Sequence, residues 1–102
     1  MFKHENYLTL TEDFDKDNIH YIWKFPNNYG ASVVRREDSY GFHQGLFELA
    51  VIKYNEKGKW DIDYDTHITN DVIGYLNEQS VNSLLDEIIK LDIKVEESGI
   101  DD

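Results

Sequence analysis

Three aspartates alternate with three apolar residues along one segment of the chain, in the order Trp60, Asp61, Ile62, Asp63, Tyr64 and Asp65. Successive side chains of a β-strand point to opposite faces of the sheet. This spacing therefore predicts a stripe of carboxylates about 6.6 to 7 Å apart on one face, with the three apolar residues turned toward the core. Such a stripe could hold a divalent cation, recognise a basic partner, imitate a phosphate backbone, or be simply the solvated face of a half-buried strand.

The metal interpretation of this stripe has little support in the sequence. A calcium-binding loop would need glycine at the position of Thr66 and glutamate at the position of Val72. Asp71 could complete a looser magnesium site, but nothing in the sequence fixes the octahedral geometry that Mg²⁺ requires. We therefore expect no metal and no cofactor, and favour recognition of a partner. The candidate partner-binding residues are Asp61, Asp63, Asp65, Asp71, Glu78 and Glu87.

Charge is unevenly distributed along the chain. The formal net charge is -11 at pH 7, and residues 61–102 hold twelve acidic and two basic residues. Residues 18–60 hold six basic and four acidic residues. The acidic half repels phosphate backbones and attracts basic surfaces, so we expect no direct nucleic-acid binding and a protein partner with a basic surface. An acidic surplus also keeps small proteins in solution, and this is a second explanation for the negative net charge.

A second group of candidate residues surrounds a glycine-containing loop. Arg35 and Arg36 end a predicted strand and precede the loop that contains Gly41, His43 and Gly45. An arginine pair beside such a loop could hold a phosphate or carboxylate through forked hydrogen bonds, which would make this region a ligand site or a small active site. The spacing matches no phosphate-binding loop, and the arginines could equally pair with neighbouring carboxylates.

No catalytic arrangement is visible along the sequence. The four histidines are scattered, and no serine, histidine and carboxylate occur in a recognised local pattern. The chain has no cysteine, which excludes a thiolate nucleophile and disulfides. We therefore assign no catalytic residue and expect a non-enzymatic protein. A catalytic triad could still form if the fold brings together residues that are far apart in the sequence.

Composition predicts one domain in the cytoplasm. The 102 residues are 40% hydrophobic and 14% aromatic, which suffices for one core. The N-terminal residues lack the apolar region of a signal peptide, and no stretch reaches the length of a membrane span. We expect the domain to cover residues 1–92, with residues 1–17 loosely ordered and residues 93–102 forming an acidic tail.

Hydrophobic periodicity predicts an α+β fold. Apolar residues at helical spacing from Val81 to Leu91 predict an amphipathic helix of about 14 residues, with Asn77 as its N-cap. A helical turn ending at Gly74 is expected before it, and residues 12–18 are expected to form a loop. Together with four strands, this gives an antiparallel sheet of about four strands with one C-terminal helix on one face. An open sheet edge would allow a homodimer. The strands are expected at residues 19–25, 31–36, 46–54 and 59–64.

Three motifs carry a resemblance to a known group of proteins. The sequences YGASVVR at 29–35, GLFELAV at 45–51 and YDTHITNDVIGYL at 64–76 resemble those of small uncharacterised proteins of tailed bacteriophages, over residues 29–91. The resemblance implies a phage accessory factor working in the host bacterial cytoplasm, with no known activity attached. Such a factor could inhibit a nucleic-acid-binding or defence protein of the host. Because the phage proteins favour proline where this chain has His67, the resemblance gives His67 no ligand role.

Overall fold

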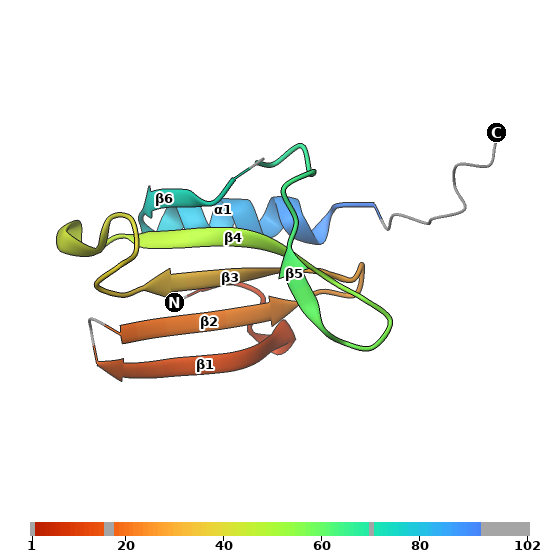
Figure 1. The fold of residues 1–102 in the computed structure, drawn as a ribbon, viewed down its shortest axis with the longest axis horizontal. Coiled ribbons are helices and arrows are strands. Elements are labelled where there is room, and N and C mark those ends of the chain that lie inside the picture. Colours follow the sequence, from red (N-terminus) through yellow and green to blue (C-terminus); the bar gives the residue numbers. More distant parts are fainter. Residues whose placement is uncertain (1, 16–17, 70, 93–102) are drawn as a thin grey trace.

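The computed structural model describes residues 2–15, 18–69 and 71–92 of the chain. In these residues, six strands form one antiparallel sheet, and an α-helix lies across one of its faces (Figure 1). The predicted α+β class, with a C-terminal helix on an antiparallel sheet, is confirmed, although the sheet has two strands more than expected. The strand order is β1-β2-β3-β4-β5, and β6 pairs with β4. The elements are η1 (Glu5–Tyr7), β1 (Leu8–Asp15), β2 (Asn18–Lys24), β3 (Tyr29–Arg35), η2 (Phe42–Gln44), β4 (Phe47–Tyr54), β5 (Trp60–Ile62), β6 (Ile73–Leu76) and α1 (Glu78–Ile89), where η denotes a 3-10 helix.

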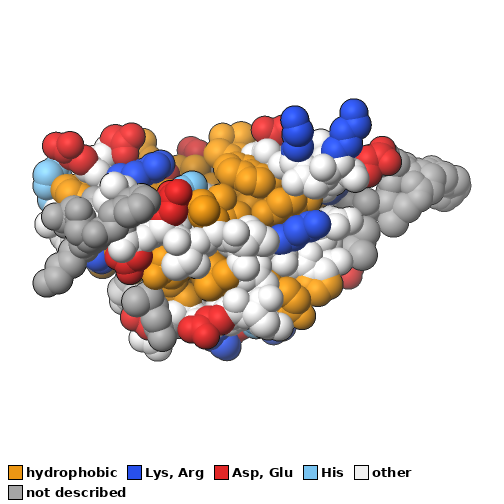
Figure 2. Space-filling view, turned by 90° about the horizontal axis from the view of Figure 1, so that it is seen from below, with side chains coloured by type: hydrophobic (Ala, Val, Ile, Leu, Met, Phe, Trp, Pro, Cys, Tyr) orange, Lys and Arg blue, Asp and Glu red, His pale blue; other side chains and the backbone are white. Residues whose placement is uncertain are grey.

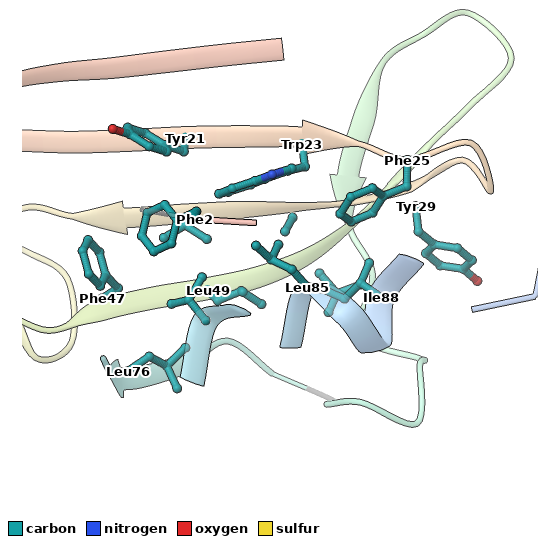
Figure 3. Close-up of a cluster of buried hydrophobic side chains, with 14 of the residues drawn as sticks. Phe2, Tyr21, Trp23, Phe25, Tyr29, Phe47, Leu49, Leu76, Leu85 and Ile88 are labelled. Atoms are coloured by element: carbon teal, nitrogen blue, oxygen red, sulfur yellow. The ribbon is translucent and has the colours of Figure 1, made fainter. Parts of the chain in front are cut away.

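The main core lies between the sheet and α1 (Figure 3). Alternate residues from β2 onward, Ile19, Tyr21, Trp23 and Phe25, are at most 8% exposed, which confirms the predicted aromatic face. β4 lies between β3 on one side and β5 and β6 on the other, so its near-continuous apolar sequence belongs to a central strand, as expected. Large rings form much of this core, and each buried aromatic side chain removes about 150 to 250 Å² of surface from water.

Helix α1 begins where the sequence predicts. The Asn77 side chain accepts a hydrogen bond from the Ser80 amide at 2.8 Å, so Asn77 is the N-cap. The buried residues of the helix are Val81, Leu85 and Ile88, which face β3, β4 and β6. Among the described residues, no helix has the length and the apolar character needed to cross a bilayer.

The second half of β1, residues 12–15, lies where the sequence predicts a loop. β1 pairs with β2, with Leu10 opposite Ile22 and Glu12 opposite His20. Charged residues are common on edge strands, because they oppose edge-to-edge association. The charged residues of β1 therefore remove the apolar alternation by which a strand is recognised in a sequence.

β6 replaces the helical turn that was predicted to end at Gly74. It pairs with the first half of β4, and the register shifts between Phe47 and Leu49. The shift is a β-bulge, in which two residues of β6, Gly74 and Tyr75, face one residue of β4, Glu48. A bulge breaks the alternation of side chains, which explains why the strand pattern was not recognised.

The apolar residues of β5 do not pack as the sequence predicts. Trp60, Ile62 and Tyr64 are 38%, 36% and 49% exposed, so they do not face the main core as predicted. In the register with β4, Ile62 lies opposite Ile52 and Trp60 opposite Tyr54, on the sheet face that α1 leaves uncovered. The β4–β5 hairpin crosses in front of the sheet in Figure 1, so β5 covers part of this face. Beneath it lies a small second cluster of Ile22, Ile52 and Tyr54, with Leu10 at its margin.

The turn between β2 and β3 also holds the end of the helix. Asn27 was predicted only as a turn residue, yet its side chain donates to the carbonyl oxygens of Ile88 at 2.9 Å and Leu91 at 2.8 Å. Its carbonyl oxygen accepts from the Tyr29 amide at 3.0 Å. Ile88 and Ile89 are the last two residues of α1, and the Asn27 side chain also donates to the Ile89 carbonyl oxygen at 3.2 Å, so it caps the end of the helix from a distant turn.

The N-terminal segment, residues 2–7, fastens α1 to the sheet. The sequence predicts loose order here, whereas the structure shows defined partners. Lys3 Nζ and His4 Nε2 lie 2.7 and 2.8 Å from the two oxygens of the Asp86 carboxylate. These two hydrogen bonds lower the pKa of the Asp86 carboxyl. Trp23 donates from Nε1 to the Lys3 carbonyl oxygen at 3.1 Å, so the segment bridges helix and sheet.

Candidate functional site

The three aspartates of the predicted stripe line one groove. Asp61 belongs to β5, and Asp63 and Asp65 follow it directly. The Asp63 amide still donates to the Val51 carbonyl oxygen at 2.8 Å, which extends the pairing with β4 by one residue. The Asp65 amide then donates to Asp63 Oδ1 at 2.8 Å and fixes the orientation of that carboxylate. We call Asp61, Asp63 and Asp65 the carboxylate stripe.

The groove beside the carboxylate stripe has a volume of about 610 Å³ and is acidic. Glu56 adds a fourth carboxylate to its lining, and Lys53 is the one basic residue that lines it among the described residues. Lys53 Nζ lies 5.6 Å above the centre of the Tyr29 ring. Burial raises the pKa of the Tyr29 hydroxyl, and the charge of Asp63 adds to this effect. The negative charge of Asp63 therefore also acts on the buried Tyr29 ring, next to the groove residue Lys53.

β5 presents a free backbone edge next to the stripe. Hydrogen bonds from the Asn55 amide to the Lys59 carbonyl and from the Asp63 amide to the Val51 carbonyl fix the pairing with β4. In an antiparallel pair the bonded positions alternate, so the backbone groups of residues 60 and 62 point away from β4. Within the described residues, β4 is the only strand that pairs with β5. The free edge thus carries exposed apolar side chains on one face and carboxylates on the other.

The other predicted acidic residues do not join this groove. Asp71 lies in the connection before β6, where its carboxylate accepts from the Val72 amide at 2.7 Å. Glu78 lies in the first turn of α1 and lines a separate hollow of about 450 Å³ with Ile19 and Phe47, at the opposite end of the sheet. Glu87 is exposed in the last part of α1 and lines neither cavity. Figure 2 also shows acidic side chains at several separate places on one side of the molecule.

The structure separates the residues of the predicted ligand site. Arg35 is the last residue of β3 and Arg36 follows it, and their side chains line hollows on opposite faces of the sheet. The Arg35 guanidinium lies 4.8 Å from the centre of the Phe47 ring and donates to the Gly45 carbonyl oxygen at 3.0 Å. Arg36 lines a groove on the other face, and His43 packs against Phe42 in η2. No described cavity contains all three residues.

The groove that Arg36 lines has a volume of about 220 Å³ and contains a polar pair absent from the sequence prediction. His20 Nε2 lies 3.0 Å from Ser32 Oγ, and His20 Nδ1 lies 4.0 Å from Glu12 Oε1. Burial and the charge of Arg36 lower the pKa of His20, although Glu12 opposes the shift. The order of groups resembles a nucleophile, base and carboxylate. However, antiparallel pairing of β2 with β3 and of β3 with β4 commits the neighbouring amides to the sheet, where they cannot serve as oxyanion donors.

His20 makes the stability of the fold depend on pH. Because its pKa in the folded protein lies below the ordinary value of 6.5, the unfolded chain takes up a proton first as the pH falls. The stabilising effect of the neutral imidazole is complete above that value and is lost as the pH falls below it. We expect urea denaturation at about pH 7 and about pH 5 to show a smaller decrease in stability for His20→Gln than for the wild type. An identical decrease for both proteins would contradict this role of His20.

Comparisons with known proteins give no further information about this site. The chain matches no protein-family model, and searches of the curated proteins and of the solved structures returned no significant match. In the part of the chain that the structure describes, no three histidine or acidic side chains come close enough together to hold a metal ion. The site is therefore interpreted from its own contacts.

Proposed function

We propose that the protein is a non-enzymatic interaction module that binds a basic, extended segment of a protein partner along β5. The observation that supports this most strongly is the combination of the carboxylate stripe with a free strand edge in one acidic groove. A partner segment that adds to this edge would form backbone hydrogen bonds with residues 60 and 62. Its basic side chains would lie next to the stripe, and its apolar side chains next to Trp60, Ile62 and Tyr64.

Long-range electrostatic attraction would increase the rate at which such a partner associates. The net charge of -11 attracts a basic surface over a distance, and the groove concentrates that attraction at one place. The resemblance to phage proteins suggests a host or phage partner in an infected bacterium. A nucleic-acid-binding or defence protein would have the required basic surface, and occupying that surface would inhibit it.

The alternative of a small-ligand site or an enzyme has less support. It depends on Arg35, Arg36 and His43 acting together, and the structure places them on different surfaces. The polar pair of His20 and Ser32 does share a groove with Arg36, but that groove is small. We therefore retain the interaction module as the function.

Quantitative affinity capture from a bacterial lysate tests the proposal. Asp61→Asn, Asp63→Asn and Asp65→Asn together should weaken capture of the main partner by about tenfold, because three exposed ion pairs of about 0.5 kcal/mol each sum to about 1.5 kcal/mol. Capture by the wild type should also decrease as the ionic strength is raised from about 0.05 to about 0.3 M.

A charge-matched variant provides the control for this experiment. Asp71→Asn, Glu78→Gln and Glu87→Gln together remove the same number of charges from residues outside the groove. The amount of partner captured by this variant should decrease by less than about threefold, because only the long-range attraction is reduced. Equal losses for the two variants would show that total charge, and not the carboxylate stripe, governs binding. Undiminished capture by the stripe variant would also refute the proposal.

A further inference from the structure

The β-bulge in β6 directs a tyrosine into solvent. Gly74 and Tyr75 together face Glu48 of β4, and an extra residue of this kind changes the direction of the side chains around it. Tyr75 is 61% exposed, more than any other large hydrophobic residue described. The bulge therefore displays this ring instead of burying it.

The backbone of Tyr75 has an unfavourable conformation. Its φ is 59°, in the left-handed region, which glycine adopts readily and a residue with a bulky side chain adopts rarely. A glycine stands immediately before it, at position 74, yet the left-handed position itself carries tyrosine. Strain of this kind is retained where the surrounding structure enforces it, and it is concentrated at functional sites. An exposed ring gives little packing energy in return.

A second exposed tyrosine lies against the first. Tyr40 is 58% exposed, and its ring centre lies 6.4 Å from that of Tyr75, with the two planes 24° apart. Two glycines allow this approach: a side chain on Gly74 would overlap the Tyr40 Cβ atom, and one on Gly41 would come within 3.0 Å of the Tyr75 Cα atom. We call Tyr40 and Tyr75 the tyrosine pair.

One carboxylate is held beside the tyrosine pair. The Tyr40 amide donates to Glu48 Oε1 at 3.0 Å, so that carboxylate is held next to the Tyr40 backbone. Glu37 and Asp38 are exposed in the same loop. The face of a tyrosine ring is negative and attracts cations, and a planar guanidinium can stack on it while it donates forked hydrogen bonds to a carboxylate. Ammonium groups lack this planar geometry.

We propose that the tyrosine pair, with Glu48, is a binding site for an arginine side chain of a protein partner. The proposal rests on the loop before β4 and on β6, and it does not require that the carboxylate stripe binds anything. If both proposals hold, the partner carries a basic strand for β5 and a separate arginine for the tyrosine pair.

Amide NMR titration with three capped tripeptides tests this site directly. The peptides are acetyl-Gly-Arg-Gly-amide and its lysine and norleucine counterparts. With the arginine peptide at millimolar concentration, we expect saturable shifts at Tyr40, Gly41 and Tyr75. The lysine peptide should bind at least threefold more weakly, and the norleucine peptide should cause no saturable shift. Equal shifts with all three peptides, or none at these residues with arginine, would overturn the proposal.

Three variants separate the tyrosine pair from a structural role and from the stripe. Tyr75→Gly removes the ring and relieves the strained φ, so it should abolish the arginine shifts while the melting temperature stays equal or rises. A lower melting temperature would show that the ring serves folding, and would overturn the proposal. Tyr64→Ala and the triple stripe variant, Asp61→Asn with Asp63→Asn and Asp65→Asn, should both keep the arginine shifts. Loss of those shifts in either variant would place the arginine at β5 and overturn the assignment to the tyrosine pair.

Discussion

Replacing Phe2 by alanine is expected to destabilise the fold by about 3 to 5 kcal/mol, which is the usual loss for a buried phenylalanine. Phe2 is 5% exposed although it stands near the start of the chain. Its ring makes edge-to-face contacts with Tyr21, Trp23 and Phe47, at centre distances of 5.5, 5.7 and 5.2 Å. Removing it would leave a cavity between the sheet and α1. Urea denaturation followed by tryptophan fluorescence measures the change.

A phenylalanine outside the main core provides the control for this prediction. Phe42 is half-buried in η2 and contacts His43, and Phe42→Ala should cost about 1 kcal/mol, as a partly exposed side chain does. If Phe2→Ala costs no more than Phe42→Ala, the N-terminal segment does not close the core. The proposed role of residues 2–7 as a fastening between helix and sheet would then be wrong.

Replacing Gly30 by alanine should destabilise the protein by about 3 kcal/mol or more, near the upper limit for overpacking. A methyl group at this position would overlap the carbonyl oxygen of Trp23, which is backbone in the middle of the sheet. The other side is closed by the Tyr54 ring, whose nearest carbon would lie 3.2 Å away. The Trp23 carbonyl group cannot move without disturbing the pairing of β2 with β3. Thermal and urea denaturation both report the effect.

Gly58→Ala is the matched comparison for Gly30→Ala. Gly58 has a φ of 80° in the β4–β5 turn, and a methyl group there would meet no atom within 4 Å. Its replacement should cost about 1 to 2 kcal/mol, through backbone conformation alone. Similar costs at Gly30 and Gly58 would mean that the close contact between β2 and β3 does not exist in solution.

Strong periodicity made part of this fold predictable. The aromatic alternation from Ile19 to Phe25 and the helical spacing from Val81 onward each describe one buried face, and both were confirmed. The Asn77 cap depends only on local residues, and it was also confirmed. These features share one property, because neighbours in sequence determine them.

Features that depend on distant contacts could not be predicted. β1 is charged because it is an edge strand, and β6 loses its alternation at the bulge opposite Glu48. The Asn27 side chain caps a helix that ends more than 60 residues later. Phe2 is buried only because the sheet and the helix form a pocket for it. None of these contacts leaves a local pattern.

The candidate site was predictable to a similar extent. Alternation predicted that Asp61, Asp63 and Asp65 lie on one strand face, and in the structure all three line one groove. The same alternation wrongly placed their apolar neighbours in the core. Arg35 and Arg36 are adjacent in sequence, and a strand sends adjacent side chains to opposite faces. The polar pair of His20 and Ser32 joins two strands, so only their register reveals it. The phage resemblance and the homodimer stay predictions.

The central claim is that a partner binds along β5. Hydrogen–deuterium exchange of the protein, alone and with the captured partner, measures this residue by residue. We expect slower exchange at residues 60 to 64 in the complex, because added backbone hydrogen bonds would protect the free edge, and little change along β1, the opposite edge. Protection along β1 with none at β5 would contradict the account.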